Sequence, residues 1–234
     1  MTNSLLSIGL ILAIIMFNIY PFYGQPKIDT IFLKKGEVFD ILLVTRNSDV
    51  ESEFKSYFQT AGPVAKRMSY QYLLGLKITN YTQGNIHPGS LVLGKWSSLK
   101  SRENFLTQIA KEVPDFHEQR RKIWSFFGLR YFEIREDFSF KINRDKYHVA
   151  TAYWFDSKKK SSNYYKKWKR KIESMGGKSI IQLKDGKSPF GYLYNPDYFV
   201  ITAWDSETAF KAFQNSIQNL ELDNIQHINE YILE

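Results

Sequence analysis

The feature that most constrains the fold is a segment that occurs twice. An apolar run ends in Trp96, a Ser cap follows, and a helical pattern carries Phe105; the same pattern surrounds Trp204 and Phe213. The spacings 204 − 96 and 213 − 105 both give 108, and the apolar strands expected to begin at 41 and 149 give 108 again. One shared offset over three elements predicts a duplicated unit of about one hundred residues.

Composition narrows the fold and excludes several chemistries. The 234 residues are 43% hydrophobic and 16% aromatic, which is enough to bury two small cores. The absence of cysteine excludes disulfides, thiolate metal sites and a Cys nucleophile. The four histidines stand singly in the sequence, so we expect neither a metal site nor a bound cofactor; they are His87, His117, His148 and His227.

The N-terminus is apolar and lacks charged side chains before Lys27. We expect residues 1–24 to be a signal peptide or a transmembrane anchor, which makes the protein membrane-anchored or exported. Basic residues after this segment would instead favour a cytoplasmic body, and a buried helix is the third reading. Residues 25–36 would then form a linker.

The remaining chain divides into two units, residues 37–136 and 145–234, joined by a linker at 137–144. In the first unit, the residues from Ser48 to Glu51 resemble a capping box that opens a helix, and Gly62-Pro63 is expected to end it. Ser97-Ser98 is expected to cap the second helix. Each unit reads β-α-β-β-α-β.

This order predicts an α+β, ferredoxin-like unit with a four-stranded antiparallel sheet and both helices on one face. The other face of each sheet would remain bare, although its strands carry aliphatic residues. Two such sheets can cover each other, so we expect the two units to pack as an intramolecular, pseudo-dimeric α/β barrel.

The segment from Val200 to Ser216 resembles the strand-to-helix segment of antibiotic-biosynthesis monooxygenases, within the dimeric α/β-barrel superfamily. The resemblance covers about twenty residues of each unit. It implies a fold shared by cofactor-independent monooxygenases, haem-degrading relatives and binding proteins. Where these relatives commonly carry His nine residues after the Trp, this chain has Phe105 and Phe213, and a phenyl ring cannot transfer a proton.

Six residues are candidates for lining a ligand pocket between helices and sheet. The two Trp side chains would stack on a flat ligand, or would simply fill the layer. An imidazole at the start of a strand would face the ligand, or would lie at the sheet edge. The candidates are Trp96, Phe105, His148, Tyr153, Trp204 and Phe213.

Positive charge is concentrated in one predicted helix of a chain with formal net charge +8. Helical periodicity turns Tyr165 and Trp168 toward the sheet and leaves a basic face outside. That face would bind an anionic membrane surface or would only be solvated, and we expect no nucleic-acid partner. It consists of Lys166, Lys167, Arg170 and Lys171.

Three functions follow from these features. The first is a membrane-associated or exported protein that binds a small apolar or aromatic ligand without histidine-dependent catalysis. The second is a cofactor-independent monooxygenase, an oxidoreductase acting on an activated aromatic substrate. The third is a non-catalytic interaction module at an anionic membrane surface. The sequence does not decide whether the chain is an enzyme, nor its oligomeric state.

Overall fold

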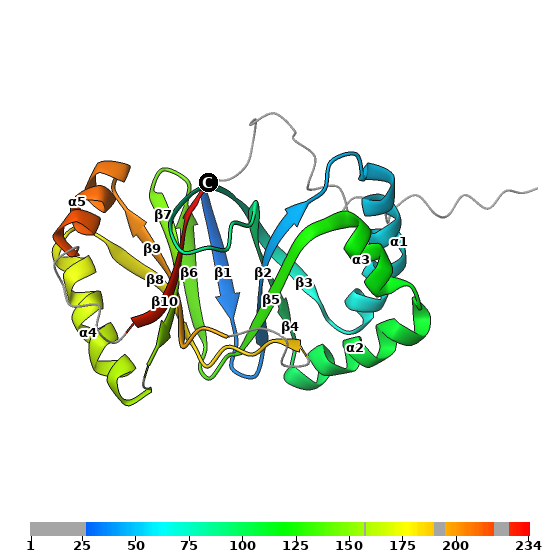
Figure 1. The fold of residues 1–234 in the computed structure, drawn as a ribbon. Helices are drawn as coiled ribbons and strands as arrows, with labels where there is room; N and C mark the ends of the chain where they lie inside the picture. The colour runs from blue at the N-terminus through cyan, green and yellow to red at the C-terminus, as the bar shows by residue number, and fades with distance from the viewer. Residues whose placement is uncertain (1–26, 157, 190–194, 218–224) are drawn as a thin grey trace, which may run out of the picture.

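The computed structural model describes residues 27–156, 158–189, 195–217 and 225–234 (Figure 1). These residues form an α+β fold with antiparallel sheets and five helices. The first unit consists of β2 (Val38–Arg46), α1 (Glu51–Arg67), β3 (Gln71–Gln83), β4 (Ser90–Trp96), α2 (Leu99–Glu112), α3 (Phe116–Ile123) and β5 (Trp124–Glu133). The second unit consists of β7 (Tyr147–Phe155), α4 (Lys158–Ser174), β8 (Lys178–Lys184), β9 (Tyr198–Trp204), α5 (Glu207–Ile217) and β10 (Ile225–Leu233).

The strands of the two units have the same order in space. The eight-stranded sheet runs β5-β2-β4-β3-β10-β7-β9-β8, so each unit contributes four strands in the ferredoxin-like order 4-1-3-2. The helices lie on the outer faces, with α1, α2 and α3 at one end of the molecule and α4 and α5 at the other (Figure 1). The shared topology fits the repeat that the sequence shows.

The two units are joined through their sheets into a closed arrangement. On one side β3 of the first unit pairs with β10 of the second, and we call this pairing the seam. On the other side the backbones of Tyr131 and Lys187 exchange two hydrogen bonds of 2.8 and 2.9 Å. The inner faces of the two four-stranded halves of the sheet therefore enclose one core, which includes Ile41, Leu93 and Ile201.

Each unit has a second core between its helices and the outer face of its sheet. In the first unit this layer holds Trp96, Phe105 and Ile109. In the second it holds Trp168, Trp204 and other aromatic side chains. The alternation of side chains along each strand divides them between the barrel interior and the helix–sheet layer.

The strand pairing refines the repeat offset. Val38 lies opposite Trp96, and Tyr147 lies opposite Trp204, so β2 and β7 correspond at 147 − 38 = 109. The expected offset of 108 for these strands is wrong by one residue, although it holds for β4 and β9. A one-residue slip in a strand exchanges the two faces. Ile41, which faces the barrel interior, therefore corresponds to Ala150 and not to Val149.

The two segments expected to be linkers contain strands. β1 (Ile28–Leu33) and β6 (Phe138–Asn143) pair antiparallel as a separate two-stranded sheet. β6 alternates apolar and polar residues, which is the pattern of a half-buried strand, whereas β1 ends in the apolar run Ile31-Phe32-Leu33, of which Phe32 is exposed. The apolar face of this pair packs into the barrel core through Ile31, Leu33, Phe140 and Ile142.

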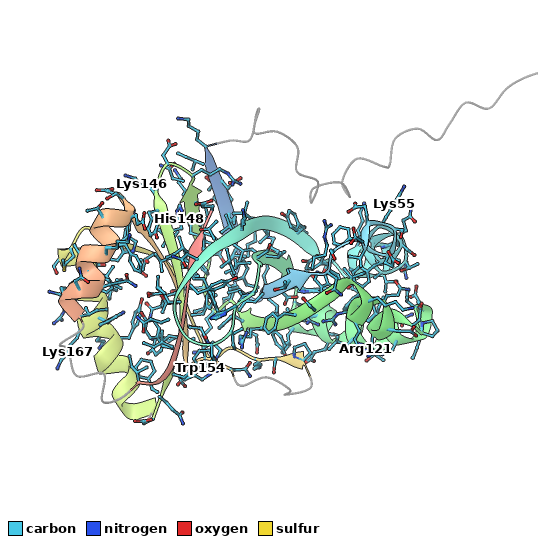
Figure 2. All side chains as sticks on the ribbon, turned by 45° about the horizontal axis from the view of Figure 1, so that its top comes forward. Lys55, Arg121, Lys146, His148, Trp154 and Lys167 are labelled. Carbon is cyan, nitrogen blue, oxygen red and sulfur yellow. The ribbon has the colours of Figure 1, made fainter. Side chains whose placement is uncertain are left out.

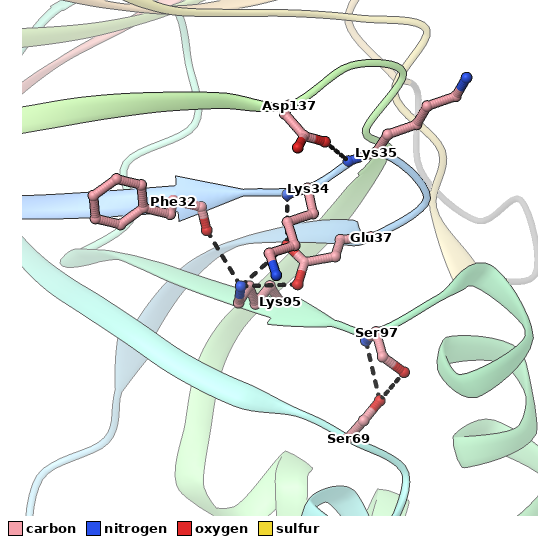
Figure 3. A network of polar contacts seen from close by, with 8 residues as sticks. All are labelled: Phe32, Lys34, Lys35, Glu37, Ser69, Lys95, Ser97 and Asp137. Carbon is pink, nitrogen blue, oxygen red and sulfur yellow. Dashed lines mark hydrogen bonds and ion pairs between the residues drawn. The ribbon is translucent and has the colours of Figure 1, made fainter.

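Polar contacts fasten the end of β1 to the first unit (Figure 3). The Nζ atom of Lys95, on β4, donates to the carbonyl of Phe32 at 3.2 Å and to the Glu37 carboxylate at 2.9 Å. The backbone N–H of Lys35 donates to Asp137, just before β6, at 2.7 Å. These contacts explain why the segments on either side of the first unit are ordered together.

The helix signals in the sequence have different outcomes. The expected cap is confirmed at Ser98, whose side chain accepts from the N–H of Ser101 at 3.1 Å. The expected helix end at Gly62-Pro63 is wrong, because α1 continues to Arg67 with Pro63 inside it. The residue before α1, Val50, makes no side-chain cap. Ala61 and Val64, on either side of Gly62-Pro63, are buried, and their packing stabilises the helix across this pair.

The membrane prediction needs correction. Within the described parts of the chain, no helix combines the length and apolar character that crossing a bilayer requires. The signal-peptide and transmembrane predictions rest only on residues 1–24, which lie outside the described residues, and the structure gives them no support.

Candidate functional site

The predicted aromatic residues of the first unit lie together in its helix–sheet layer. The rings of Trp96 and Phe105 are 5.0 Å apart, and both side chains are buried. The Trp96 Nε1–H donates to the Asp40 carboxylate at 2.8 Å. The structure therefore places this pair inside the packed layer of the first unit.

The predicted aromatic residues of the second unit form an equivalent cluster. The rings of Trp204 and Phe213 are 4.9 Å apart, and Trp204 Nε1–H donates to the Thr202 hydroxyl at 3.0 Å. Tyr153 lies in the same layer, where its hydroxyl accepts a 2.6 Å hydrogen bond from Trp168 Nε1–H. The two clusters belong to separate units and do not share a pocket.

His148 is separated from these aromatic residues. It alternates along β7 with Ala150 and Trp154, which face the barrel interior, whereas Tyr153 belongs to the helix–sheet layer. Burial lowers the pKa of the imidazole. His148 and Tyr153 therefore lie on opposite faces of the sheet and cannot contact one ligand within the helix–sheet layer.

The first unit buries an ion pair that the sequence analysis missed. Arg102, on α2, donates from Nε to Asp40, on β2, at 3.2 Å, and both side chains are buried. The guanidinium also lies over the Trp96 and Tyr131 rings, 5.3 Å from each centroid. Burial raises the pKa of Asp40, while the charge of Arg102 opposes that change. This pair links the second helix of the unit to its sheet.

The second unit buries a carboxyl group without a cationic partner in the described part of the chain. Glu230, on β10, is only 4% exposed. It accepts hydrogen bonds from the Thr82 hydroxyl at 2.6 Å, the Thr151 hydroxyl at 3.0 Å and the Gln214 amide at 3.0 Å. Gln83, on the neighbouring strand β3, lies directly opposite Glu230 in the strand pairing. Burial raises the pKa of Glu230, and these neutral hydrogen bonds oppose the increase.

The surroundings of Glu230 come from both units. Thr82 and Gln83 belong to β3 of the first unit, whereas Thr151 and Gln214 belong to the second. Tyr153 lies two residues after Thr151 on the same face of β7, and burial raises its pKa well above its usual value. The carboxyl group therefore lies where the two units meet.

A pocket opens beside this carboxyl group. Its volume is about 290 Å³, and Gln83, Gly84 and residues 225–228 line it. Gln83 lies directly opposite Glu230 in the strand pairing, and Ile228 lies two residues before Glu230 on the same strand face. Gln83 therefore belongs both to the pocket lining and to the strand pairing at Glu230.

The rim of the pocket is held in place by the buried Asn229. Its Oδ1 accepts from the N–H groups of Asn85 and Ile86 at 3.2 and 3.4 Å. Gly84 has φ +93°, and a Cβ atom there would lie 2.1 Å from Asn229 Oδ1. Only glycine fits this approach, so the rim is fixed before any ligand binds.

A second hollow lies on the first unit, between α1 and the connection from α2 to α3. Its volume is about 380 Å³, and it is lined by Thr60, Pro63, Val64, Arg67 and residues 112–115. Arg67 and Glu112 form an ion pair in its wall. This hollow lies within one unit, whereas β3 and β10 of different units line the other pocket.

The basic residues of α4 face away from the sheet. Lys166, Lys167 and Arg170 are exposed, and Lys171 is partly exposed, while Tyr165 and Trp168 are buried. Figure 2 shows Lys167 on the outer surface of the molecule. The predicted orientation of this helix is confirmed, whereas the anionic surface it would bind stays a prediction.

The histidines are unsuited to holding a haem between helices and sheet. His87 stacks on Tyr81 in a loop, and His117 is exposed on α3. His148 faces the barrel interior, and His227 packs beside Trp154. Because none of the four imidazoles enters either helix–sheet layer, no histidine there could be the axial ligand of a haem. Among the described residues, no cluster of His, Asp and Glu could hold a metal ion.

Sequence reasoning missed the buried polar residues, although a signal for them is present. Asp40 and Glu230 are each the only acid within an otherwise largely apolar strand. Such a residue must either face solvent or be compensated inside. The partners Arg102 and Thr151 carry no comparable signal, because they stand on patterns that equally suit an exposed surface.

The fold resembles that of two solved structures, whose relatives include dimeric α/β-barrel proteins. An anthrone oxidase-like protein is 17% identical, with 88% of this chain and 94% of that chain covered and a TM-score of 0.50. Chlorite dismutase from Candidatus Nitrospira defluvii is 9% identical, with 86% and 92% covered and a TM-score of 0.52. No protein family model matches the sequence, and no curated protein is similar to it. At these identities the likeness extends to the fold alone.

Proposed function

We propose that this protein binds a small molecule in the pocket beside Gln83, with Glu230 as the polar group that recognises the ligand. The observation that carries the proposal is a buried carboxyl group that accepts hydrogen bonds only from neutral groups and lies opposite Gln83, a residue of the pocket lining. A carboxyl group in such a place costs stability unless it is paired, and binding sites are where proteins accept this cost.

The dimensions of the site suit a small ligand. The pocket of about 290 Å³ is at the lower end of the range for small-molecule sites, which corresponds to a compound of roughly one or two rings. Its position at the seam also explains why two units are needed, because β3 and β10 each contribute one wall.

A change that fills the pocket tests the proposal. Thermal unfolding of the full chain would be followed with a set of small aromatic compounds. A ligand at one hundred times its Kd should stabilise the protein by about 2.7 kcal/mol. Ile228→Trp should abolish this stabilisation, whereas Thr60→Trp in the other hollow should preserve it. Equal loss in both variants, or equal retention, would place binding elsewhere.

The second candidate is a cofactor-independent monooxygenase acting on an activated aromatic compound. The observation that favours it is Glu230, because a buried carboxylate can accept a proton from a substrate. The phenyl rings at Phe105 and Phe213 weigh against it, since neither can take this role. Oxygen uptake with phenolic substrates, present in the wild type and lost in Glu230→Gln, would establish this activity.

A further inference from the structure

The orientation of the buried Asn229 amide is fixed by its backbone partners. Its Oδ1 atom lies 3.2 and 3.4 Å from the backbone nitrogens of Asn85 and Ile86. Backbone N–H groups can only donate, so the oxygen of the amide must face them. The amide nitrogen then faces His227, two residues earlier on the same side of β10, where it lies 2.9 Å from Nε2. Asn229 is 0% exposed, so water does not compete for this contact.

This contact determines where the proton of the His227 ring lies. The amide nitrogen of Asn229 is a donor and not an acceptor, so Nε2 of the imidazole must accept. A neutral imidazole whose Nε2 accepts carries its proton on Nδ1. A protonated ring would instead place an N–H group against the N–H group of the amide. Asn229 therefore holds His227 as the neutral tautomer with the proton on Nδ1.

His227 belongs to the wall of the pocket that Gln83 and Gly84 also line. The His227 side chain is partly exposed, whereas Asn229 behind it is buried. Its ring packs beside Trp154 with 5.0 Å between the ring centroids, which limits rotation of the imidazole. Within the described parts of the chain the ring is hydrogen-bonded through Nε2, and the Nδ1–H group remains for a ligand.

We propose that His227 contacts the ligand and selects compounds with a hydrogen-bond-accepting oxygen, such as the carbonyl group of a small aromatic ketone. The selection rests on the proposed function, because it takes place in the same pocket, but it does not involve Glu230, which lies on the opposite face of β10. Ile225 and Ile228 supply apolar surface for the ring of such a compound. A compound that only donates hydrogen bonds meets no acceptor on this imidazole, since Asn229 occupies Nε2.

The first test compares two probes of the same shape. Acetophenone carries a carbonyl group, and α-methylstyrene has a methylene group in place of the oxygen. Both would be titrated into the full chain by calorimetry. In His227→Phe, which keeps a ring and removes the donor, acetophenone should lose about two- to tenfold in affinity relative to α-methylstyrene. His117→Phe, at an exposed histidine of α3, is the control and should leave the ratio of the two affinities unchanged.

The second test locates the proton directly. NMR spectra that correlate ring protons with ring nitrogens would be recorded on the isotope-labelled full chain, and the spectrum of His227→Phe identifies the His227 signals. The wild type should carry the proton on Nδ1 and none on Nε2. Asn229→Asp replaces the donating NH₂ group with an accepting oxygen, so Nε2 should become protonated. The wild-type spectrum decides the tautomer even if Asn229→Asp does not fold.

The outcomes separate the two levels of the proposal. An unchanged affinity ratio in His227→Phe would overturn the selection by His227, while binding of either probe would leave the binding function intact. A proton on Nε2 in the wild type would overturn the selection as well, whether or not the probes bind. No binding of either probe would overturn both. Near-ultraviolet circular dichroism would confirm that each variant is folded.

Discussion

The two units share a topology but bury their polar groups in different places. The pair Asp40 and Arg102 of the first unit corresponds to Val149 and Phe210 of the second, by the strand pairing and the helix offset. Conversely, the polar residues Glu230 and Thr151 of the second unit correspond to the apolar residues Leu129 and Leu42 of the first. Each unit is therefore apolar where the other is polar.

This exchange shows which polar groups the fold itself requires. In the second unit the apolar residues Val149 and Phe210 fill the place that Asp40 and Arg102 occupy in the first. The layer can therefore be packed with or without the ion pair. Leu42 and Leu129 likewise show that apolar residues can occupy the positions that Thr151 and Glu230 occupy in the second unit. The topology therefore requires neither the Asp40–Arg102 pair nor the Glu230 carboxyl group. Of the two, Glu230 lies near a pocket, so it is the stronger functional candidate.

The largest expected effect comes from breaking the ion pair of the first unit. Arg102→Ala leaves Asp40 buried without its cation, which should lower the free energy of unfolding by about 3–5 kcal/mol. Urea denaturation measures the change. Lys100→Ala, on the same helix, is the control and should stay within about 0.5 kcal/mol of the wild type.

A double substitution sharpens the same comparison. Asp40→Val with Arg102→Phe installs the residues that the second unit uses at these positions. Replacing a buried ion pair with apolar residues is often neutral or stabilising by about 1–4 kcal/mol. The double variant should therefore recover most of the stability that Arg102→Ala loses. A double variant less stable than the single one would show that the units are not interchangeable here.

The next effect is a dependence of stability on pH that originates in the second unit. The pKa of Glu230 is raised in the folded state above its ordinary value of 4.5. Between these two values the folded protein binds more protons than the unfolded chain, so the free energy of unfolding falls as pH rises. This contribution is fully present below pH 4.5 and is lost as pH rises through the folded value.

Comparison of two variants isolates this contribution. Urea denaturation over a pH series should give a shallower decline for Glu230→Gln than for the wild type. Glu207→Gln, at the exposed start of α5, should reproduce the wild-type slope. Identical slopes for all three proteins would mean that Glu230 titrates as it does in the unfolded chain.

A smaller effect tests the different packing around the two Trp residues. Tyr70 packs on Trp96 with their rings 4.9 Å apart, whereas the corresponding residue of the second unit is Gly177. A Cβ atom at Gly177 would lie 2.6 Å from both Ile172 and Trp204. Gly177→Ala should therefore cost about 1–3 kcal/mol through overpacking. Gly62→Ala has free space on α1 and should stabilise by about 0.5–1 kcal/mol.

The smallest effect should be equal in the two units. Ser98 caps α2 by accepting from the Ser101 N–H at 3.1 Å, and Ser206 caps α5 by accepting from the Ala209 N–H at 3.2 Å. Replacing either Ser with Ala should cost about 1 kcal/mol. Thermal unfolding of both variants checks the equality, and a cost confined to one cap would break the symmetry.

The sequence predicts much of the fold because the repeat has a strong local signature. The Trp strands and the helices after them are apolar, capped and periodic, and the structure has them where the pattern places them. β1 and β6 were missed because six-residue segments beside charged residues resemble linkers until a partner strand is known. The one-residue shift between β2 and β7 was missed for a similar reason, since both registers align apolar residues.

The candidate site was less predictable because it depends on long-range contacts. Trp204 and Phe213 were placed in the helix–sheet layer correctly by periodicity. His148 could not be assigned to a face without the register of β7. Glu230 meets Thr82 and Thr151, which are 148 and 79 residues away, and no local pattern predicts such a meeting.

The seam between β3 and β10 has a consequence for how the molecule behaves on dilution. When two separate subunits pair their sheets, association costs translational and rotational entropy, and the assembly dissociates at low concentration. Here both strands belong to one polypeptide, with Gln83 opposite Glu230. Pairing these two strands within one chain carries no such association entropy, and no twofold axis forces a substitution in one unit to appear in the other.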